Sequence, residues 1–73
     1  MLKDEFVKQV GNSIRKKREQ KKLTLEELAN VAGIEYSQLS RIEKGKINTS
    51  IFCTYNIANA LEISITDLFH FAE

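Results

Sequence analysis

Residues 24–45, TLEELANVAGIEYSQLSRIEKG, constrain the fold of this chain more than any other segment. Apolar side chains recur at the spacing of an amphipathic helix on both sides of a central glycine. They are Leu25, Leu28, Ala29 and Ala32 before Gly33, and Ile34, Leu39 and Ile42 after it. Because glycine takes a positive φ at little cost, Gly33 suits a sharp turn. The segment therefore predicts two short helices that meet at a steep angle.

Two helices joined by such a turn form a helix-turn-helix, whose second helix can enter the major groove of DNA. The second helix is expected over about residues 35–44, with a polar outer face and with Gly45 as its C-cap. The motif at residues 24–45 therefore predicts a protein that reads the sequence of double-stranded DNA.

The rest of the chain also indicates helices. It contains three glycines, no proline and no stretch in which apolar and polar residues alternate as they do in a strand. We expect helices at about 3–21, 24–33, 35–44, 50–62 and 65–71. The sequence thus predicts one all-α domain of five helices over residues 1–73.

Capping residues mark the starts of two of these helices. Thr24 and Glu27 have the spacing of a capping box, in which each side chain bonds the other residue's backbone N–H. Ser64 and Asp67 repeat this spacing before the last helix. Glu35, at the start of the third helix, is a mediocre cap.

Helical periodicity also predicts core positions. In the first helix they are Phe6, Val7, Val10 and Ile14, with Gly11 as a weaker candidate, and in the fourth they are Ile51, Thr54, Tyr55, Ala58 and Leu61. The same register places Phe52 outside the core.

Charge is distributed unevenly along the chain. Residues 1–46 hold all 11 Lys and Arg and seven acidic residues, a net charge of +4, whereas residues 47–73 hold three acidic residues and a net charge of −3. The asymmetry suggests one face turned toward an anionic partner. By itself, the basic run at residues 15–22 is better explained as the solvated face of an amphipathic helix than as a DNA-binding surface.

Composition argues against several other classes of protein. No apolar run approaches the roughly 20 residues of a membrane span, and no secretory pattern is seen, so a cytoplasmic location is expected. Cys53 is the only cysteine and has no histidine near it in sequence, which argues against a disulfide, a metal site or redox chemistry. His70 has no suitably spaced nucleophile. We therefore expect that the protein is not an enzyme and that it binds no cofactor and no small-molecule ligand.

Three stretches carry a family resemblance: VGNSIRKKREQKKLTLEELANVAG, YSQLSRIEKGK and SIFCTYNIANALEISITDLF. Residues 10–69, which contain them, resemble the Xre/Cro/C1-type helix-turn-helix family, the fold of the lambdoid phage repressors. The resemblance implies a compact five-helix, lambda repressor-like DNA-binding domain.

The resemblance also implies site residues. Tyr36, Ser37 and Arg41, with Gln38 close to them, correspond to base-reading positions, and an arginine there can donate two hydrogen bonds to the O6 and N7 of a guanine. The residues that correspond to phosphate contacts are Thr24, Ser50, Lys46 and Asn48, with Lys44 and Arg15 as weaker candidates. Arg18 and Glu43 correspond to a structural ion pair between the first helix and the end of the third.

This sequence departs from the family pattern at three positions. Leu25 stands where a phosphate-binding glutamine is usual, which puts one DNA contact in doubt. Glu35 replaces a small N-cap, and Thr49 replaces a proline. The opening without proline is common in small controller proteins of restriction-modification systems, which suggests that subgroup beside the phage repressors.

Relatives of this size commonly form homodimers, and a two-fold dimer would place two recognition helices roughly 34 Å apart on a pseudo-palindromic operator. Phe52, Ile65, Phe69 and Phe71 are the candidates for the dimer interface. In the alternative, Phe69 and Phe71 close the core of their own domain.

The leading hypothesis is a transcriptional regulator, with activation and repression both open. An antitoxin-type DNA-binding protein is one alternative. A protein-interaction module without DNA binding is the other, and Leu25, Glu35 and the small net charge support it.

Overall fold

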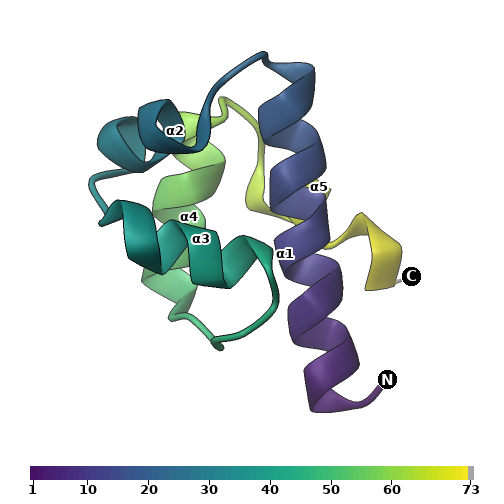
Figure 1. Ribbon diagram of the computed structural model, residues 1–73. Coiled ribbons are helices and arrows are strands. Elements are labelled where there is room, and N and C mark those ends of the chain that lie inside the picture. The colour runs from purple at the N-terminus through teal and green to yellow at the C-terminus, as the bar shows by residue number, and fades with distance from the viewer. Residues whose placement is uncertain (73) are drawn as a thin grey trace.

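Helix α1 is the longest element, and the other helices pack against it or against one another (Figure 1). The computed structural model describes residues 1–72. The elements are α1 (Lys3–Gln20), α2 (Leu25–Ala32), α3 (Tyr36–Glu43), α4 (Ile51–Ala60), α5 (Ile65–Leu68) and a 3₁₀ turn, η1 (His70–Ala72). Every regular element of the described chain is helical, as predicted.

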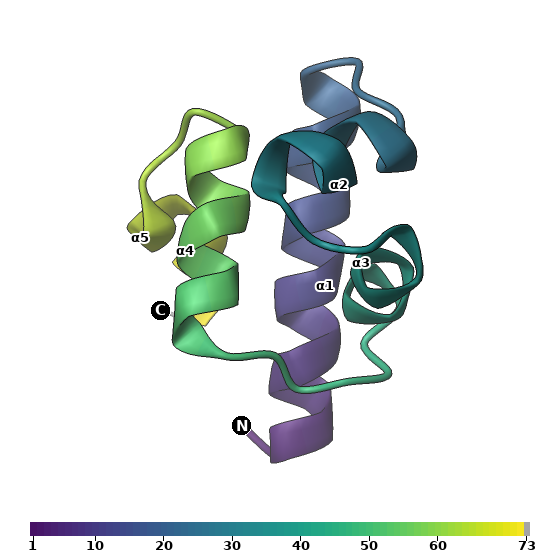
Figure 2. The same ribbon diagram turned by 90° about the vertical axis from the view of Figure 1, so that its left-hand side faces the viewer.

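The helices form two groups around α1. Helix α3 packs against the middle of α1, and α2 lies across one end of α3, so that α2 and α3 form the steep pair predicted from residues 24–45. Helix α4 packs against α2, and α5 packs against both α4 and α1 (Figure 2). This arrangement leaves one side of α3 facing away from the rest of the molecule.

Helix α2 begins with the predicted capping box. The Glu27 N–H donates to Thr24 Oγ1 at 3.0 Å, and the Thr24 N–H donates to Glu27 Oε1 at 2.8 Å. The helix ends at Gly33, whose φ of 73° is left-handed. Because residues that carry a Cβ rarely adopt this backbone conformation, glycine is favoured at this turn.

Helix α3 begins without such a cap. Glu35 makes no side-chain hydrogen bond to the first turn of the helix. At the other end the chain leaves the helix through Gly45, with a φ of 71°, and the Lys46 N–H donates to the Arg41 carbonyl at 2.9 Å. The stop predicted at Gly45 is therefore confirmed.

Each of the five α-helices contributes at least one large aliphatic side chain to the core. Its largest fully buried members are Ile14, Leu28, Leu39, Ile57, Leu61 and Leu68. Burying each of these side chains contributes about 1.5–3 kcal/mol relative to leaving it exposed. On α1, Val10, Gly11 and Ile14 are buried as predicted, whereas Phe6 and Val7 are only partly buried.

The predicted register of α4 is partly wrong. Thr54, Ala58 and Leu61 are buried as expected, but Ile51 is 84% exposed and Tyr55 is 49% exposed. Cys53 and Ile57, which are not among the predicted core positions, are buried, so the buried face of α4 is rotated around the helix axis from the expected one. Apolar residues surround α4 on nearly every side, so periodicity alone could not identify its buried face.

The last helix is shorter than the predicted 65–71. Helix α5 ends at Leu68, and Phe69, with φ of −106° and ψ of 14°, leaves the helical conformation. The chain then turns so that Phe69 and Phe71 pack on Phe6 of α1, with ring centroids 5.8 and 5.6 Å away. Contacts with α1 thus decide where this helix ends.

Candidate nucleic-acid interface

The outer face of α3 is polar and exposed. Tyr36 is 55% exposed, and Ser37 and Arg41 are also exposed. Leu39 and Ile42, on the opposite face, are buried in the core. The division follows directly from the helical spacing of these residues, because positions 39 and 42 share one face. Three of the four predicted base-reading side chains are therefore available to a ligand.

Arg41 carries the charge of this face. Within residues 1–72 its guanidinium has neither an ion-pair partner nor a hydrogen-bond partner. A guanidinium presents five N–H donors in a planar fork. All of them are free to bind acceptors outside the protein.

Gln38 does not join the other three side chains. It is partly buried, and its Nε2 lies 3.9 Å from Sγ of Cys53, to which it donates a weak hydrogen bond. The residue therefore points toward α4 and links α3 to the start of α4. No sequence signal predicts this contact, because the two residues lie on separate helices and neither belongs to a recognisable sequence motif.

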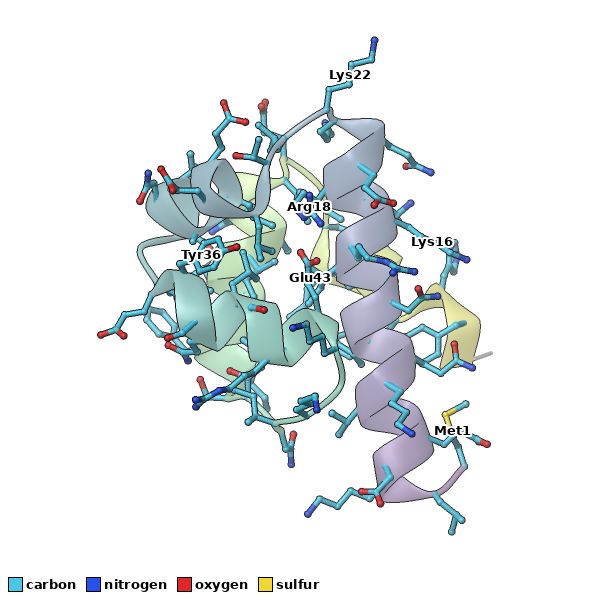
Figure 3. The ribbon with its side chains drawn as sticks, viewed as in Figure 1. Met1, Lys16, Arg18, Lys22, Tyr36 and Glu43 are labelled. Carbon is cyan, nitrogen blue, oxygen red and sulfur yellow. The ribbon has the colours of Figure 1, made fainter. Side chains whose placement is uncertain are left out.

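Arg18 and Glu43 form the ion pair implied by the resemblance. Arg18 Nε donates to Glu43 Oε2 at 2.8 Å, and Nη2 donates to Oε1 at 3.0 Å. Arg18 Nη1 also donates to the Leu23 carbonyl at 3.0 Å, a bond to the turn before α2 that the sequence does not predict. The two side chains point toward each other from α1 and α3 (Figure 3), and they are only 15% and 6% exposed.

The environment of Arg18 confirms that its charge is engaged inside the protein. The hydrogen bond to Glu43 raises the pKa of Arg18 above its ordinary value, and burial opposes this in part. The arginine stays charged at any physiological pH, and its hydrogen bonds connect α1 to α3 and to the α1–α2 turn. Arg18 is not available for DNA.

The two predicted helix-start phosphate sites differ. At α2 the Thr24 N–H is already bound to Glu27, and the first turn carries both Glu26 and Glu27. At α4 the Ser50 Oγ accepts from the Cys53 N–H at 3.0 Å, and the first turn carries no acidic residue. An anion near the start of α2 meets two carboxylates, whereas one near α4 meets only the helix dipole.

The other candidate phosphate contacts are accessible. Lys44, Lys46 and Asn48 lie at the end of α3 and in the segment that follows it. Arg15 is exposed on α1, and its Nη2 donates to Asn12 Oδ1 at 2.8 Å. In contrast, Lys16 points away from α3 on the far side of α1 (Figure 3).

A second exposed surface is apolar. Ile51, Phe52 and Tyr55 lie on the first turns of α4, with Phe52 70% exposed and its ring stacked on that of Tyr55 at 6.4 Å. Beside them lies an apolar groove of about 340 Å³, whose lining includes Phe6, Ile47, Ile51, Ile65 and Phe69. We call this groove together with Ile51, Phe52 and Tyr55 the α4 face.

The α4 face overlaps in part with the patch predicted from the sequence, since Phe52 lies on it and Ile65 and Phe69 line its groove, whereas Phe71 does not. Phe69 and Phe71 also pack on Phe6, as in the alternative that closes the domain's own core. Ile51 and Tyr55 are the exposed neighbours of Phe52.

The described residues hold no cluster of His, Cys, Asp or Glu that is suited to a metal ion. None of the helices found among them is both long and apolar enough to cross a membrane.

Comparison with known proteins agrees with the geometry. Residues 14–68 match the model of the family HTH_3, described as Helix-turn-helix. The HTH-type transcriptional regulator y4dJ of Sinorhizobium fredii (strain NBRC 101917 / NGR234) is 34% identical over 61 residues, 84% of this chain and 79% of that protein.

Solved structures resemble the whole fold. The restriction-modification controller protein C.AhdI of Aeromonas hydrophila matches with a TM-score of 0.85 and 32% identity, over 86% of this chain and 96% of that one. The clp gene regulator ClgR of Corynebacterium glutamicum matches with a TM-score of 0.86 and 28% identity, over 99% of this chain and 90% of that one.

Proposed function

This chain belongs to the helix-turn-helix family and is a DNA-binding transcriptional regulator, and we propose that it reads its operator through the outer face of α3. The observation that carries this proposal is the free, exposed guanidinium of Arg41 in the last turn of α3. We assign Arg41 to a guanine, with bidentate hydrogen bonds to O6 and N7, which is the commonest specific contact in the major groove. Tyr36 and Ser37 are exposed in the first turn of the same helix.

We assign the main contacts with the phosphate backbone of DNA to the end of α3 and the start of α4. Lys44, Lys46 and Asn48 supply side chains. The backbone N–H groups in the first turn of α4, after the N-cap Ser50, supply further donors, and the dipole of α4 favours an anion there. The start of α2 ranks lower, because Glu26 and Glu27 repel phosphate there. Leu25 cannot replace the lost hydrogen bond of the family glutamine, so we expect binding to depend mostly on the α3–α4 segment.

We further propose that the regulator is a homodimer and that a second copy covers the α4 face. The ten residues of α4 carry no charge, so two copies can bring this face together without repulsion between like charges. The exposed Phe52 and Tyr55 lie next to the apolar groove, so that each copy offers both a projecting side chain and a hollow. Such a self-complementary surface is what a two-fold interface requires.

Similarity to C.AhdI favours a small regulator of the controller type over the antitoxin and the interaction module, because the match covers nearly all of that protein. The free Arg41 also argues against a module that has lost DNA binding.

Selection of bound sites from random double-stranded DNA tests the proposal. Wild type is compared with Arg41→Ala and with the control Lys16→Ala, which removes an exposed cation that does not lie on α3. We expect wild type and Lys16→Ala to enrich the same palindrome, with half-sites about one helical turn apart, and Arg41→Ala to lose the base preference at one position of each half-site. If all three proteins enrich no site, the proposal is wrong.

A further inference from the structure

We infer that Gly11 is a positioning residue for DNA reading: its missing side chain lets the end of α3 lie directly against α1, and this contact sets where Arg41 stands. The inference rests on the proposed function and adds to it the residue that aligns the reading helix. Gly11 is buried in α1 and is not part of the exposed face of α3.

The approach of the two helices at Gly11 leaves no room for a methyl group. A Cβ at this position would lie 2.2 Å from the Ile42 carbonyl oxygen, 2.7 Å from the Glu43 oxygen and 2.9 Å from the Glu43 carbonyl carbon. Real Cβ atoms essentially never come within 3.0 Å of such atoms. These are main-chain atoms of a helix end, so no side-chain rotation can relieve the overlap. An alanine at position 11 must therefore move α3 away from α1.

Neighbouring contacts tie the same end of α3 to the same face of α1. A Cβ at Gly45 would meet Lys8 Cα at 2.7 Å, and Glu43 binds Arg18 further along α1. Residues 8, 11 and 18 lie on one face of a helix. We call these contacts at Lys8, Gly11 and Arg18 the α1–α3 junction. Figure 1 shows the end of α3 beside α1.

The backbone does not require a glycine at position 11. Only Gly33 and Gly45 have a positive φ among the glycines, and Gly11 lies inside a regular helix. Glycine in a helix interior is about 1 kcal/mol less favourable than alanine. The close approach to α3 is therefore the only reason that the structure offers for it. Gly33 is the opposite case, since its φ is 73° but nothing lies within 4 Å of the place that a Cβ would take.

The position of the α3 end matters because of Arg41. It lies two residues before Glu43, and its carbonyl also accepts the Lys46 N–H. Bidentate hydrogen bonds to a base edge tolerate little displacement, whereas attraction between lysines and phosphates falls off slowly with distance. Moving α3 outward should thus weaken base reading much more than general attraction to DNA.

The test compares two glycine variants of the full chain, Gly11→Ala and Gly33→Ala. Their dissociation constants for the selected operator and for a scrambled duplex are measured by fluorescence anisotropy at two salt concentrations, and their thermal unfolding is recorded. We expect Gly11→Ala to lose about tenfold or more in operator affinity, the value of one good base contact, and to bind the scrambled duplex within about twofold of wild type. Gly33→Ala should unfold at a lower temperature but keep the wild-type ratio of the two affinities.

A folded Gly11→Ala protein with the wild-type ratio would overturn the inference. If that variant fails to fold, Arg18→Lys probes the same junction, because it keeps the charge but loses the bidentate geometry. If folded Arg18→Lys has a reduced ratio of operator affinity to scrambled-duplex affinity, the α1–α3 junction controls base reading. An unchanged ratio overturns the inference. Failure of the proposed function itself looks different, since wild type then prefers no duplex at all.

Discussion

Helices α2 and α3 have the same length of eight residues, yet they are held in different ways. Helix α2 begins with a complete capping box from Thr24 and Glu27 and ends at a glycine with positive φ. Helix α3 also stops before a glycine with positive φ, Gly45, but it has no side-chain cap at its start, and its end is held against α1 through Arg18 and Gly11. Local sequence thus specifies both ends of α2, whereas the position of α3 also depends on contacts with residues distant in sequence.

This difference suits the task of each helix. In the proposed function the first turn of α3 faces DNA, and a side chain that capped this turn would compete for its backbone N–H groups, whereas an anchor at the opposite end leaves them free. Tyr36 and Ser37 accordingly remain exposed at the start of α3. We therefore expect that removing the Arg18–Glu43 pair lowers the free energy of unfolding more than removing the Thr24 cap of α2.

The largest effect is expected from Glu43→Ala. This change leaves the guanidinium of Arg18 mostly buried without its carboxylate, and breaking such a pair costs about 3–5 kcal/mol. We expect the lower end of that range, since the Leu23 carbonyl still accepts from Arg18. Urea unfolding followed by circular dichroism measures the change. The double variant Arg18→Met, Glu43→Leu should recover part of the loss; a further loss would contradict this explanation.

A smaller loss is expected from Thr24→Ala. It removes the side-chain acceptor of the Glu27 N–H, and loss of an N-cap typically costs about 1 kcal/mol. The same urea titration measures it, with Ser37→Ala as an exposed control that caps nothing. If Thr24→Ala destabilised the protein as much as Glu43→Ala, the contrast between the two helices would be wrong.

Lys22→Gly should stabilise the protein. Helix α1 ends with the Leu23 N–H donating to the Arg18 carbonyl and the Lys22 N–H donating to the Glu19 carbonyl, the pattern that favours glycine at position 22. Lys22 has a φ of 59° instead, in the left-handed region. We expect a gain of roughly 0.5–1 kcal/mol in the free energy of unfolding. Lys21→Gly, where φ is −85°, is the control and should lose stability.

Acid should weaken the cap of α2. Hydrogen bonds from the backbone and the side chain of Thr24 lower the pKa of Glu27 below its ordinary 4.5. A carboxyl whose folded pKa is lowered adds stability above its unfolded pKa and loses it as pH falls through the folded value. Thermal unfolding between pH 6 and pH 3 should therefore show a smaller decrease for Glu27→Gln than for wild type. Parallel curves would exclude a contribution from Glu27.

Prediction from sequence succeeded where the determinants are local. The capping box, the turn at Gly33 and the buried Leu39 and Ile42 all follow from residues within a few positions of one another. The exposed, polar face of α3 follows from the same periodicity.

Prediction failed where distant residues decide. Helix α4 is apolar on most sides, so the exposure of Ile51 and Tyr55 depends on how α2 and α5 pack against it. The early end of α5 depends on Phe6, at the opposite end of the chain. The contact of Gln38 with Cys53 and the close approach at Gly11 also join separate helices, and no short sequence pattern encodes them.

The most direct test of the account is whether Arg41 contacts a guanine. Each guanine of the selected operator is replaced in turn by 7-deazaguanine, which lacks the N7 acceptor, and affinity is measured for wild type and for Arg41→Ala. We expect one guanine in each half-site at which the analogue weakens wild-type binding but leaves Arg41→Ala unaffected. Equal losses for both proteins at every guanine would contradict the account.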